Sequence, residues 1–593
     1  MPLERNNCAK QMPGLMVAIV AVAALSVGPS TSQGQVLAPR SPQTLPTLPH
    51  PVLPPPPPPP YTLIHNFDCT LYATGAAADG CSPDGPGYLA QGRDGNLYGT
   101  VPSGGNLTYP KYDGGTIFSI GPNSPFPFAV IYTLGFNATD GMASHSGLTM
   151  GMDGVFYGTA EHGGAASGGN GSVFSFGGNG FTTLSPAFSG GLGGGYPWAP
   201  PIEAPDGNLY GVTNGGSTQK GVIYRCSPTT SQCVSPLYAF NVNVTDALVF
   251  GFDGYLYGTT QAGSANAQGA FSTIGGGTVF RIPLTAAGTV QPTFLHNFDP
   301  NAMVPSAAGG QVLDGSVPKG SVMIASDGNL YGTTSGGGSG GQGVIYQLNP
   351  SSGAYRVLHA FSTYTTTFTA NQQQYSAKVS DGSGSESGLV QGSDGFLYGV
   401  ATTGGPLGGS LGGLVPVCTY SPNTGCGTLF KIDTSGNNFA VIYSFGQVIQ
   451  CSPTVTSDNG SFPVSTPTLH TNGKIYGMTT RGGCRDNYGA LYSFDAGLKP
   501  FVSIVGGSRW VNVGSKVGVI GQGFNSTTGV FLGNSTTPLG KLSVQIFSDT
   551  YMEVSVPQLL GRTHISVQMP SGTLTSPQFI CTPPPAPGLA SIC

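Results

Sequence analysis

The sequence predicts an all-β protein: a seven-bladed β-propeller closed by an N-terminal strand, followed by a C-terminal immunoglobulin-like sandwich. Three observations predict this fold. A short signature recurs seven times, two further apolar elements recur with it, and the pattern changes near residue 498. No segment shows the 3.6-residue hydrophobic period that is typical of a helix.

The signature is Asp-Gly-x-x-Tyr-Gly, with Asn replacing Asp in the seventh copy. Asp-Gly or Asn-Gly between two apolar runs is the strongest short signal for a β-hairpin, and it predicts a type I′ turn. The seven copies begin at Asp94, Asp153, Asp206, Asp253, Asp327, Asp394 and Asn472.

Two other elements accompany each copy: a Gly-x-aliphatic-aromatic element after it and an apolar run ending in Phe before it. Both are short, β-branched and aromatic, as expected of strands. With one more strand before each Asp-Gly, a repeat holds about four strands, which is one propeller blade. An array of β-sandwiches is the alternative. The Phe elements end at Phe67, Phe136, Phe188, Phe240, Phe298, Phe361 and Phe445.

The phase of the repeat predicts how the ring closes. The first Phe element, YTLIHNF, precedes every Asp-Gly copy, and no such element follows the seventh copy. The N-terminal strand is therefore expected to supply the outer strand of the last blade, which leaves no open edge at the join. The propeller is placed at residues 61–497.

The combined pattern, DGnLYGtT followed by GG and GtvF, resembles the GloVer (Gloeobacter–Verrucomicrobia) tandem repeat of exported bacterial proteins, over roughly residues 61–494. The resemblance implies an exported, propeller-like repeat domain without a settled biochemical activity. It implies no catalytic residues.

Residues 498–581 alternate like sandwich strands and resemble an IPT/TIG domain. Gly-x-Gly-Phe ending at Phe524 and Ser-Asp-Thr ending at Thr550 carry the resemblance. It implies a spacer or interaction module, and residues 582–593 are interpreted as a tail.

The N-terminus indicates export. Residues 1–35 read as a signal peptide, with Arg5 and Lys10 before an apolar run from Leu15 to Val27. An uncleaved anchor is the alternative. Residues 36–60 form a Pro-rich linker that ends in seven prolines and is expected to be a stiff spacer. The mature protein is expected to be secreted, extracellular or at the cell surface, with the periplasm as an alternative, and without a membrane span.

The cysteines agree with export, because an even number in an exported chain indicates disulfides. Apart from Cys8 in the signal, ten cysteines fall into close sequential pairs. The proposed pairs are Cys69/Cys81, Cys226/Cys233, Cys418/Cys426, Cys451/Cys484 and Cys581/Cys593. No CxxC motif is present, so a zinc site is not expected.

Composition and motifs narrow the function. The net charge is −5 and no Lys/Arg cluster occurs, which argues against nucleic-acid binding. No GxSxG, Walker A, HExxH or EF-hand motif is present, so no catalytic residue, cofactor or metal ligand is assigned. A glycosidase-like carboxylate pair stays open, with the candidates Glu161, Glu203, Asp381 and Glu386.

The repeated residues are interpreted as architectural. The signature Asp is assigned to the turn, and the signature Tyr to packing between blades. Three histidines, His65, His296 and His359, share one register that other copies fill with Tyr, so we interpret this register as a structural position. No partner is visible in the sequence for His145, His162 or His470. Trp198 is assigned to packing, with ligand contact as the alternative.

Loop lengths predict the ligand face. From each Phe to the next Asp or Asn the spacings are 27, 17, 18, 13, 29, 33 and 27 residues. The blade-to-blade links and the loops between second and third strands should share one face, which is built up around blades five, six, seven and one. The longest link is polar and suits hydrogen-bonded recognition; its candidate residues are Tyr364, Gln372, Gln373, Gln374 and Tyr375.

These observations favour an exported, non-enzymatic recognition protein that binds glycan or protein on one propeller face. The alternatives are a propeller-based polysaccharide lyase or glycoside hydrolase, and a purely structural surface protein. The sequence does not determine the oligomeric state.

Overall fold

The computed structural model describes part of the chain. The chain divides into two units, residues 1–58 and 59–593, and the described residues belong to the second. The expected signal peptide and nearly all of the linker therefore lie outside the described residues. These are residues 60–582, apart from 69–77, 86, 106–113, 123–126, 136–139, 164–168, 179, 185–187, 189–193, 216–220, 241, 245, 252, 266–270, 273–274, 285–290, 371–372, 407–423, 447, 453–454, 483–487, 507–508, 541–542 and 560.

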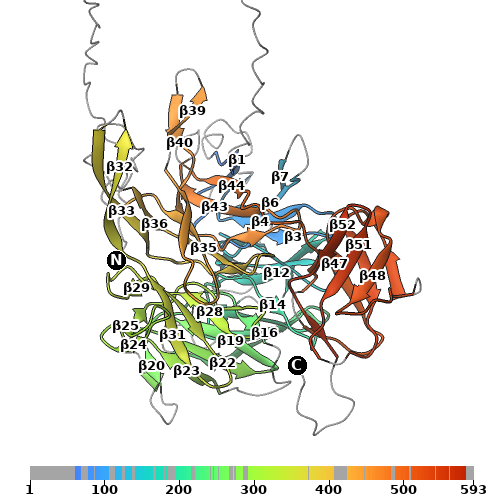
Figure 1. Ribbon diagram of the computed structural model, residues 1–593. Helices are drawn as coiled ribbons and strands as arrows, with labels where there is room; N and C mark the ends of the chain where they lie inside the picture. Colours follow the sequence, from blue (N-terminus) through green and yellow to red (C-terminus); the bar gives the residue numbers. More distant parts are fainter. Residues whose placement is uncertain are drawn as a thin grey trace, which may run out of the picture. The chain divides into compact units, whose positions relative to one another are not determined.

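The described chain is all-β (Figure 1), and its repeats form seven antiparallel sheets in which four strands follow the same order; the seventh sheet has a fifth strand, β41 (Ser461–Pro463), paired with β43. We number the sheets one to seven along the chain. Sheet one contains β3 (Ala90–Gln91), β4 (Leu97–Val101), β6 (Thr116–Ile120) and β7 (Phe128–Thr133). Sheet two contains β9 (Thr149–Met150), β10 (Phe156–Ala160), β12 (Ser172–Gly177) and β13 (Gly180–Leu184). Sheet three contains β14 (Ile202–Glu203), β15 (Leu209–Thr213), β16 (Val222–Ser227) and β17 (Gln232–Ala239).

The remaining four sheets repeat this order. Sheet four contains β18 (Val249–Phe250), β19 (Tyr255–Thr260), β22 (Thr278–Pro283) and β23 (Thr293–Asn297). Sheet five contains β27 (Met323–Ile324), β28 (Leu330–Thr333), β30 (Val344–Leu348) and β31 (Tyr355–Ala360). Sheet six contains β34 (Val390–Gln391), β35 (Leu397–Ala401), β37 (Thr428–Ile432) and β38 (Ala440–Ser444). Sheet seven contains β42 (Thr468–Leu469), β43 (Ile475–Arg481), β44 (Ala490–Phe494) and β1 (Tyr61–Asn66).

The N-terminal strand completes sheet seven, as the phase of the repeat predicts. β1 pairs antiparallel with β44, in a register that runs from Tyr61 opposite Phe494 to Asn66 opposite Ala490. Phe67 follows the strand and is fully buried. The prediction that β1 pairs with the last repeat is confirmed.

Consecutive sheets pack together through the signature tyrosines. Seven apolar clusters each contain the signature Tyr of one sheet and buried side chains of the next. One of them places Tyr476 of sheet seven beside Leu97 and Phe118 of sheet one. The prediction that this Tyr packs between repeats is confirmed, and the last sheet contacts the first.

The turn type predicted for Asp-Gly is wrong. In the first copy Gly92 N–H donates to Asn96 O (2.8 Å) and Gly95 N–H donates to Gly92 O (3.0 Å), which defines a three-residue loop. Gly95 has a φ of 82°, whereas Asp94 is not among the positive-φ residues. The loop is therefore a type I turn followed by a left-handed glycine, because the residue before Asp also belongs to it.

The signature Asp still acts as a turn residue, and it also holds the signature Tyr. Asp94 accepts hydrogen bonds from Asn96 N–H (3.1 Å) and from the Tyr98 hydroxyl (2.7 Å). In the seventh copy the Asn472 amide donates to the Tyr476 hydroxyl (3.0 Å). Either side chain can serve because the hydroxyl donates to a carboxylate and accepts from an amide.

The links between sheets and the loops between second and third strands lie on one side, as predicted, because they pair with each other. We call this side the link face and the side of the Asp-Gly turns the turn face. The pairs join β2 (Ala78–Cys81) to β5 (Ser103–Gly105), β8 (Gly141–Met142) to β11 (His162–Gly163), β26 (Gly315–Ser316) to β29 (Gly336–Gly337), and β33 (Gln373–Ser383) to β36 (Thr403–Pro406).

The three histidines of the shared register bind the links on this face. His65, His296 and His359 contact Asp79 (2.7 Å), Asp314 (2.9 Å) and Asp381 (3.0 Å), each through Nε2. Each ring also stacks at 3.6–3.7 Å on an aromatic ring of the next sheet. These contacts agree with a structural role for this register.

The C-terminal residues form a sandwich around a separate apolar core. Its larger sheet contains β45 (Ser503–Ile504), β47 (Lys516–Ile520), β50 (Tyr551–Ser555) and β49 (Val544–Ile546). The second contains β48 (Gly529–Leu532), β51 (Ile565–Met569) and β52 (Gly572–Thr575), and a parallel pair joins β46 (Arg509–Trp510) to β53 (Ile580–Cys581).

This sandwich contacts the turn face. Thr550 Oγ1 donates to Arg93 O (2.7 Å), and the Arg93 guanidinium lies 4.5 Å from the centre of the Tyr551 ring. Phe501 N–H donates to Thr471 O (3.1 Å). Arg93 and Thr471 each precede the Asp or Asn of a signature. The sandwich therefore contacts the turns of sheets one and seven.

One predicted disulfide is described completely. Cys226 and Cys233 lie opposite each other on β16 and β17 and form a disulfide. Cys81, Cys426 and Cys581 are also disulfide-bonded. The cysteines expected to pair with them, Cys69, Cys418 and Cys593, lie outside the described residues, as does Cys484, and the side chain of Cys451 is not described.

Candidate functional site

The residues predicted to bind a ligand lie on a β-hairpin of the link face. The longest link folds into β32 (Thr363–Ala370) and β33, and this hairpin stands away from the four-stranded sheets (Figure 1). Tyr364 is 48% exposed. Gln373, Gln374 and Tyr375 belong to β33 without described side chains, and Gln372 lies outside the described residues.

The four candidate carboxylates do not form a pair with one another; each has its own partners. Asp381 binds His359 and the Ser362 N–H (2.7 Å). Glu203 accepts from Met152 N–H (2.6 Å), and Glu386 pairs with Lys319. The partners of Glu161 are two histidines, His145 and His162.

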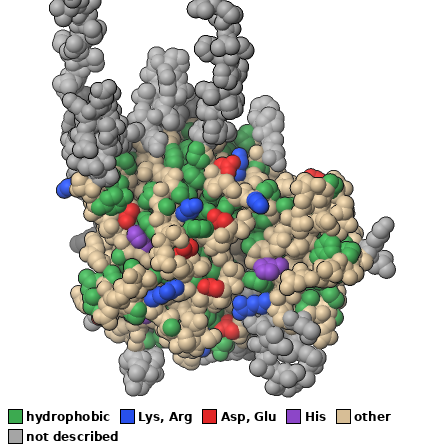
Figure 2. Space-filling model, viewed as in Figure 1, with side chains coloured by type: hydrophobic (Ala, Val, Ile, Leu, Met, Phe, Trp, Pro, Cys, Tyr) green, Lys and Arg blue, Asp and Glu red, His purple; other side chains and the backbone are tan. Residues whose placement is uncertain are grey.

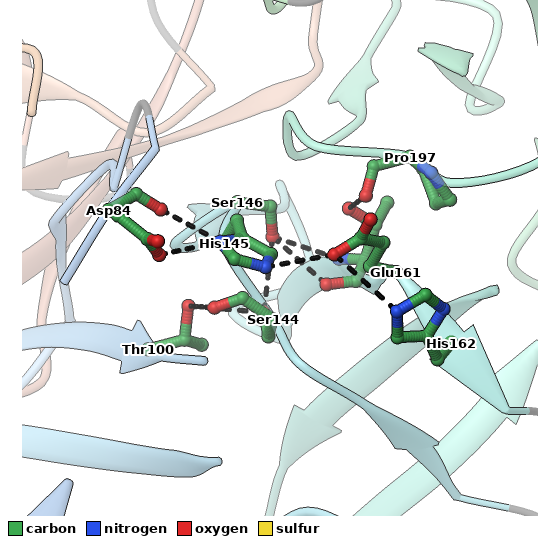
Figure 3. A network of polar contacts seen from close by, with 9 residues as sticks. Asp84, Thr100, Ser144, His145, Ser146, Glu161, His162 and Pro197 are labelled. Carbon is green, nitrogen blue, oxygen red and sulfur yellow. Dashed lines mark hydrogen bonds and ion pairs between the residues drawn. The ribbon is translucent and has the colours of Figure 1, made fainter. Parts of the chain in front are cut away.

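Glu161 belongs to a polar cluster on the link face that the sequence did not reveal (Figure 3). His145 lies between two carboxylates: Nδ1 is 2.8 Å from Asp84 Oδ1, and Nε2 is 2.9 Å from Glu161 Oε2. The Trp198 ring stacks on the His145 ring, with centroids 4.8 Å apart and an interplanar angle of 12°. His162 Nε2 lies 3.8 Å from the same Glu161 oxygen. We call Asp84, His145, Glu161, His162 and Trp198 the link cluster.

The cluster combines segments that are far apart in the sequence. Asp84 comes from the link before sheet one, His145 from the link before sheet two, and Trp198 from the link before sheet three. Glu161 and His162 follow β10 in sheet two. The expectation that His145 and His162 lack partners is wrong, because only the fold brings these loops together.

Small residues hold the loops close. Gly85 has a φ of 123°, and a Cβ there would lie 2.9 Å from His145 Cβ. Ser144 donates to Thr100 Oγ1 (3.1 Å), and Ser146 donates to Thr159 O (3.2 Å) (Figure 3). The side chains on both sides of His145 are thereby hydrogen-bonded to two sheets.

His145 and Glu161 shift each other's pKa. Burial lowers the pKa of His145, but the hydrogen bonds to Asp84 and Glu161 outweigh it and raise this pKa to about 10. Burial raises the pKa of Glu161, but the His145 hydrogen bond and charge lower it below its ordinary value overall. At neutral pH His145 is therefore an imidazolium and Glu161 a carboxylate.

This arrangement suits binding more than proton transfer. A general base or acid works best with a pKa near the working pH, and the His145 and Glu161 pKa values are moved away from it. Asp84 is 57% exposed and His162 is 49% exposed, so carboxylate and imidazole atoms face solvent. The Trp198 side chain also bonds to Glu161 and contributes to the lowered pKa of this carboxyl group.

The third histidine without a visible partner also has one. His470 Nε2 is 2.9 Å from Gly95 O, and its Nδ1 accepts from Asn472 N–H. Burial lowers the pKa of His470, so the neutral ring joins sheet seven to sheet one.

Other site types have no support in the described residues. No group of three or more His, Cys, Asp or Glu among them is placed to hold a metal ion. No helix in this part of the chain is long and apolar enough to cross a membrane. Figure 2 shows the charged side chains of one face as few and dispersed.

Comparison with known proteins supports the repeat. The profile of the Gloeobacter/Verrucomicrobia repeat family matches residues 166–377. No curated protein matches the chain.

Solved structures show weak similarity. The periplasmic gluconolactonase of Pseudomonas aeruginosa is 15% identical, covers 55% of this chain and 84% of its own, and has a TM-score of 0.31. Hydrazine synthase of Kuenenia stuttgartiensis is 13% identical, with coverages of 61% and 96% and a TM-score of 0.31. An ulvan lyase is 9% identical, with coverages of 66% and 94% and a TM-score of 0.30. At these TM-scores none of them carries an argument about function.

Proposed function

We propose that the protein is an exported recognition protein that binds an uncharged glycan on the link face of a seven-bladed β-propeller. The seven equivalent sheets, the seven clusters between them and the β1–β44 pairing support a propeller at residues 61–497. The separate core beyond it supports an IPT/TIG-like domain at residues 498–581. The disulfide between Cys226 and Cys233 supports export, since disulfides persist in oxidising compartments.

The observation that carries the proposal is the link cluster. Asp84 and Glu161 offer carboxylate oxygens that accept hydrogen bonds from hydroxyl groups, and Trp198 offers an aromatic ring beside them. The imidazolium of His145 compensates one of the two negative charges. A hydroxyl-rich, uncharged ligand fits this surface better than an anionic one.

The same cluster argues against glycoside hydrolysis at this place. A glycosidase needs one carboxyl group with a raised pKa as its general acid. The pKa of Glu161 is lowered by its bond to His145. Sugar binding without cleavage is therefore the function that these residues support best.

The test is a glycan and polysaccharide binding screen on the full secreted chain, with product analysis for cleavage. We expect a bound glycan that stays intact and a Trp198→Ala variant that binds it at least tenfold more weakly. Phe547→Ala is the matched control, because Phe547 is an exposed aromatic residue of the sandwich. Cleaved products would establish an enzyme instead, and absence of any glycan ligand would refute the proposal.

The β32–β33 hairpin is proposed as a second contact for a long glycan. Tyr364→Ala separates the two parts of the link face, because Tyr364 is exposed and lies outside the link cluster. Weaker binding of long oligosaccharides with unchanged binding of short ones is expected. Unchanged affinity for every length would remove the hairpin from the site.

A further inference from the structure

A second site lies on the axis around which the sheets are arranged. The first strands of all seven sheets line a cavity of about 540 Å³, together with residues of the C-terminal sandwich. Pockets that hold small molecules are typically of this size. The wall includes Met150, Val249, Phe250, Ile324 and Leu469 from the sheets, and Ile504 and Phe579 from the sandwich.

The polar side chains of this wall are engaged by the protein itself. Gln91 donates to Thr471 Oγ1 (2.8 Å) and accepts from Thr471 N–H (3.1 Å). Gln391 accepts from Ser326 N–H (2.8 Å) and donates to Gly395 O (3.2 Å).

The polar wall residue of the sandwich, Gln578, also bonds to the protein itself. Gln578 accepts from Ile504 N–H (3.1 Å) and donates to Ser503 Oγ (3.0 Å). Both ends of all three amides are thus satisfied without a ligand. The wall therefore recognises a molecule mainly through apolar contact.

Two residues that break the repeat meet at the end of the cavity toward the link face. One position, two residues before the first strand of each sheet, holds Gly, Pro, Ala, Ser or Thr in six copies and Tyr in the first. The residues are Tyr88, Gly147, Pro200, Ala247, Ser321, Gly388 and Thr466. The preceding position is small in six copies and acidic in the fourth: Gly87, Ser146, Ala199, Asp246, Gly320, Ser387 and Ser465.

The two exceptional residues meet across the axis. The Tyr88 hydroxyl donates to Asp246 Oδ1 (2.6 Å) and lies 2.7 Å from Ser321 Oγ. Ser321 N–H donates to the other Asp246 oxygen (2.5 Å). Sheets one, four and five are joined at this point, and six small residues leave the space that the tyrosine fills.

We propose that the axial cavity is a binding site for an uncharged, mainly apolar small molecule that enters from the side of the sandwich. Tyr88 lines the end of the cavity toward the link face, where Asp246 accepts its hydroxyl hydrogen bond, and the sandwich forms part of the wall. A charged ligand is disfavoured, because its charge would have to leave water for a mainly apolar wall whose described acidic side chain, Glu203, already accepts from Met152 N–H (2.6 Å). This site is distinct from the link cluster, since no residue of that cluster lines the cavity.

The test uses N-phenyl-1-naphthylamine, an uncharged apolar dye whose fluorescence rises in an apolar environment, with the full secreted chain. We expect saturable binding of one dye per chain. Met150→Trp and Val249→Trp fill the cavity and should each raise the Kd at least tenfold. Met303→Trp and Val130→Trp are matched controls, since these residues are exposed and outside the wall, and should change the Kd less than twofold.

A second measurement keeps the test independent of the variants' folding. Benzophenone, a photoreactive apolar probe, is cross-linked to the wild-type chain and the adducts are mapped by peptide mass spectrometry. Adducts on β9, β18, β27 or β45 support the site. Non-saturable dye binding by the wild type, dye binding that persists in both folded wall variants, or adducts only elsewhere would overturn it.

Discussion

The charge on His145 gives the most direct experimental test of the link cluster. We consider the variant His145→Phe, which keeps an aromatic ring beside Trp198 and removes the imidazolium between Asp84 and Glu161. The prediction concerns how the stability of the two proteins depends on pH.

The size of the expected stability difference follows from the pKa of His145. Its folded value is about 10, above the ordinary histidine value of 6.5. A raised histidine pKa stabilises the fold fully below the unfolded value, and this stabilisation is lost as the pH rises through the folded value. Between about pH 6 and about pH 9.5 the free energy of unfolding of the wild type should fall by about 4 kcal/mol relative to that of the variant.

The assay is urea unfolding of both proteins at several pH values across this window, followed by tryptophan fluorescence. Other groups that titrate in the window act on both proteins, so the difference between the two curves isolates His145. The difference should shrink steadily as the pH rises. Parallel pH dependences would refute the claim that His145 is charged in the folded protein.

Three further predictions concern the fold. Tyr331→Phe removes the hydroxyl that donates to Asp327 at 2.6 Å and should cost about 1–2 kcal/mol in urea unfolding, whereas no loss would mean that this bond is replaced by water. Phe67→Ala should cost about 3–5 kcal/mol, because Phe67 is fully buried where β1 closes sheet seven; a cost below about 1 kcal/mol would contradict that packing. Replacing Cys226 and Cys233 by Ser should lower stability by only about 2–3 kcal/mol, since the two cysteines are only 7 positions apart in the sequence, and a larger loss in calorimetry would show a role beyond loop closure.

The repeat architecture could be predicted because local sequence patterns determine it. Strand propensity, turn residues and an apolar period are properties of short segments, and seven copies make them visible in one chain. The N-terminal strand was predictable for the same reason, since Phe67 precedes the first signature and the seventh repeat lacks its own Phe element.

The turn geometry shows where a local rule failed. Asp-Gly predicted a two-residue type I′ turn, but the residue before Asp, such as Arg93, belongs to the loop. The extra residue lets Asp94 keep a negative φ and leaves only Gly95 in the left-handed region. Counting the paired residues on both sides of the turn decides between the two types, and that pairing is a property of the sheet.

Both candidate sites depended on contacts between distant segments. A signal for the axial site was present: Tyr88 and Asp246 are exceptions at two otherwise small positions, and aligning the repeats two residues before each first strand finds them. No comparable signal marks the link cluster, because Asp84, His145 and Trp198 occur in links of different length and composition.

The sequence by itself determined the all-β class, the number of repeated units, the pairing of the first strand with the last repeat and the structural role of the signature tyrosines. Only the tertiary structure decided that the sandwich contacts the turn face, that His145 lies between two carboxyl groups, and that Tyr88 lines the axial cavity. The physical reason is the range of the interactions. Hairpins and strand faces are set by neighbours a few residues apart, whereas burial, charge pairing and cavities are set by side chains that meet only after the sheets have packed.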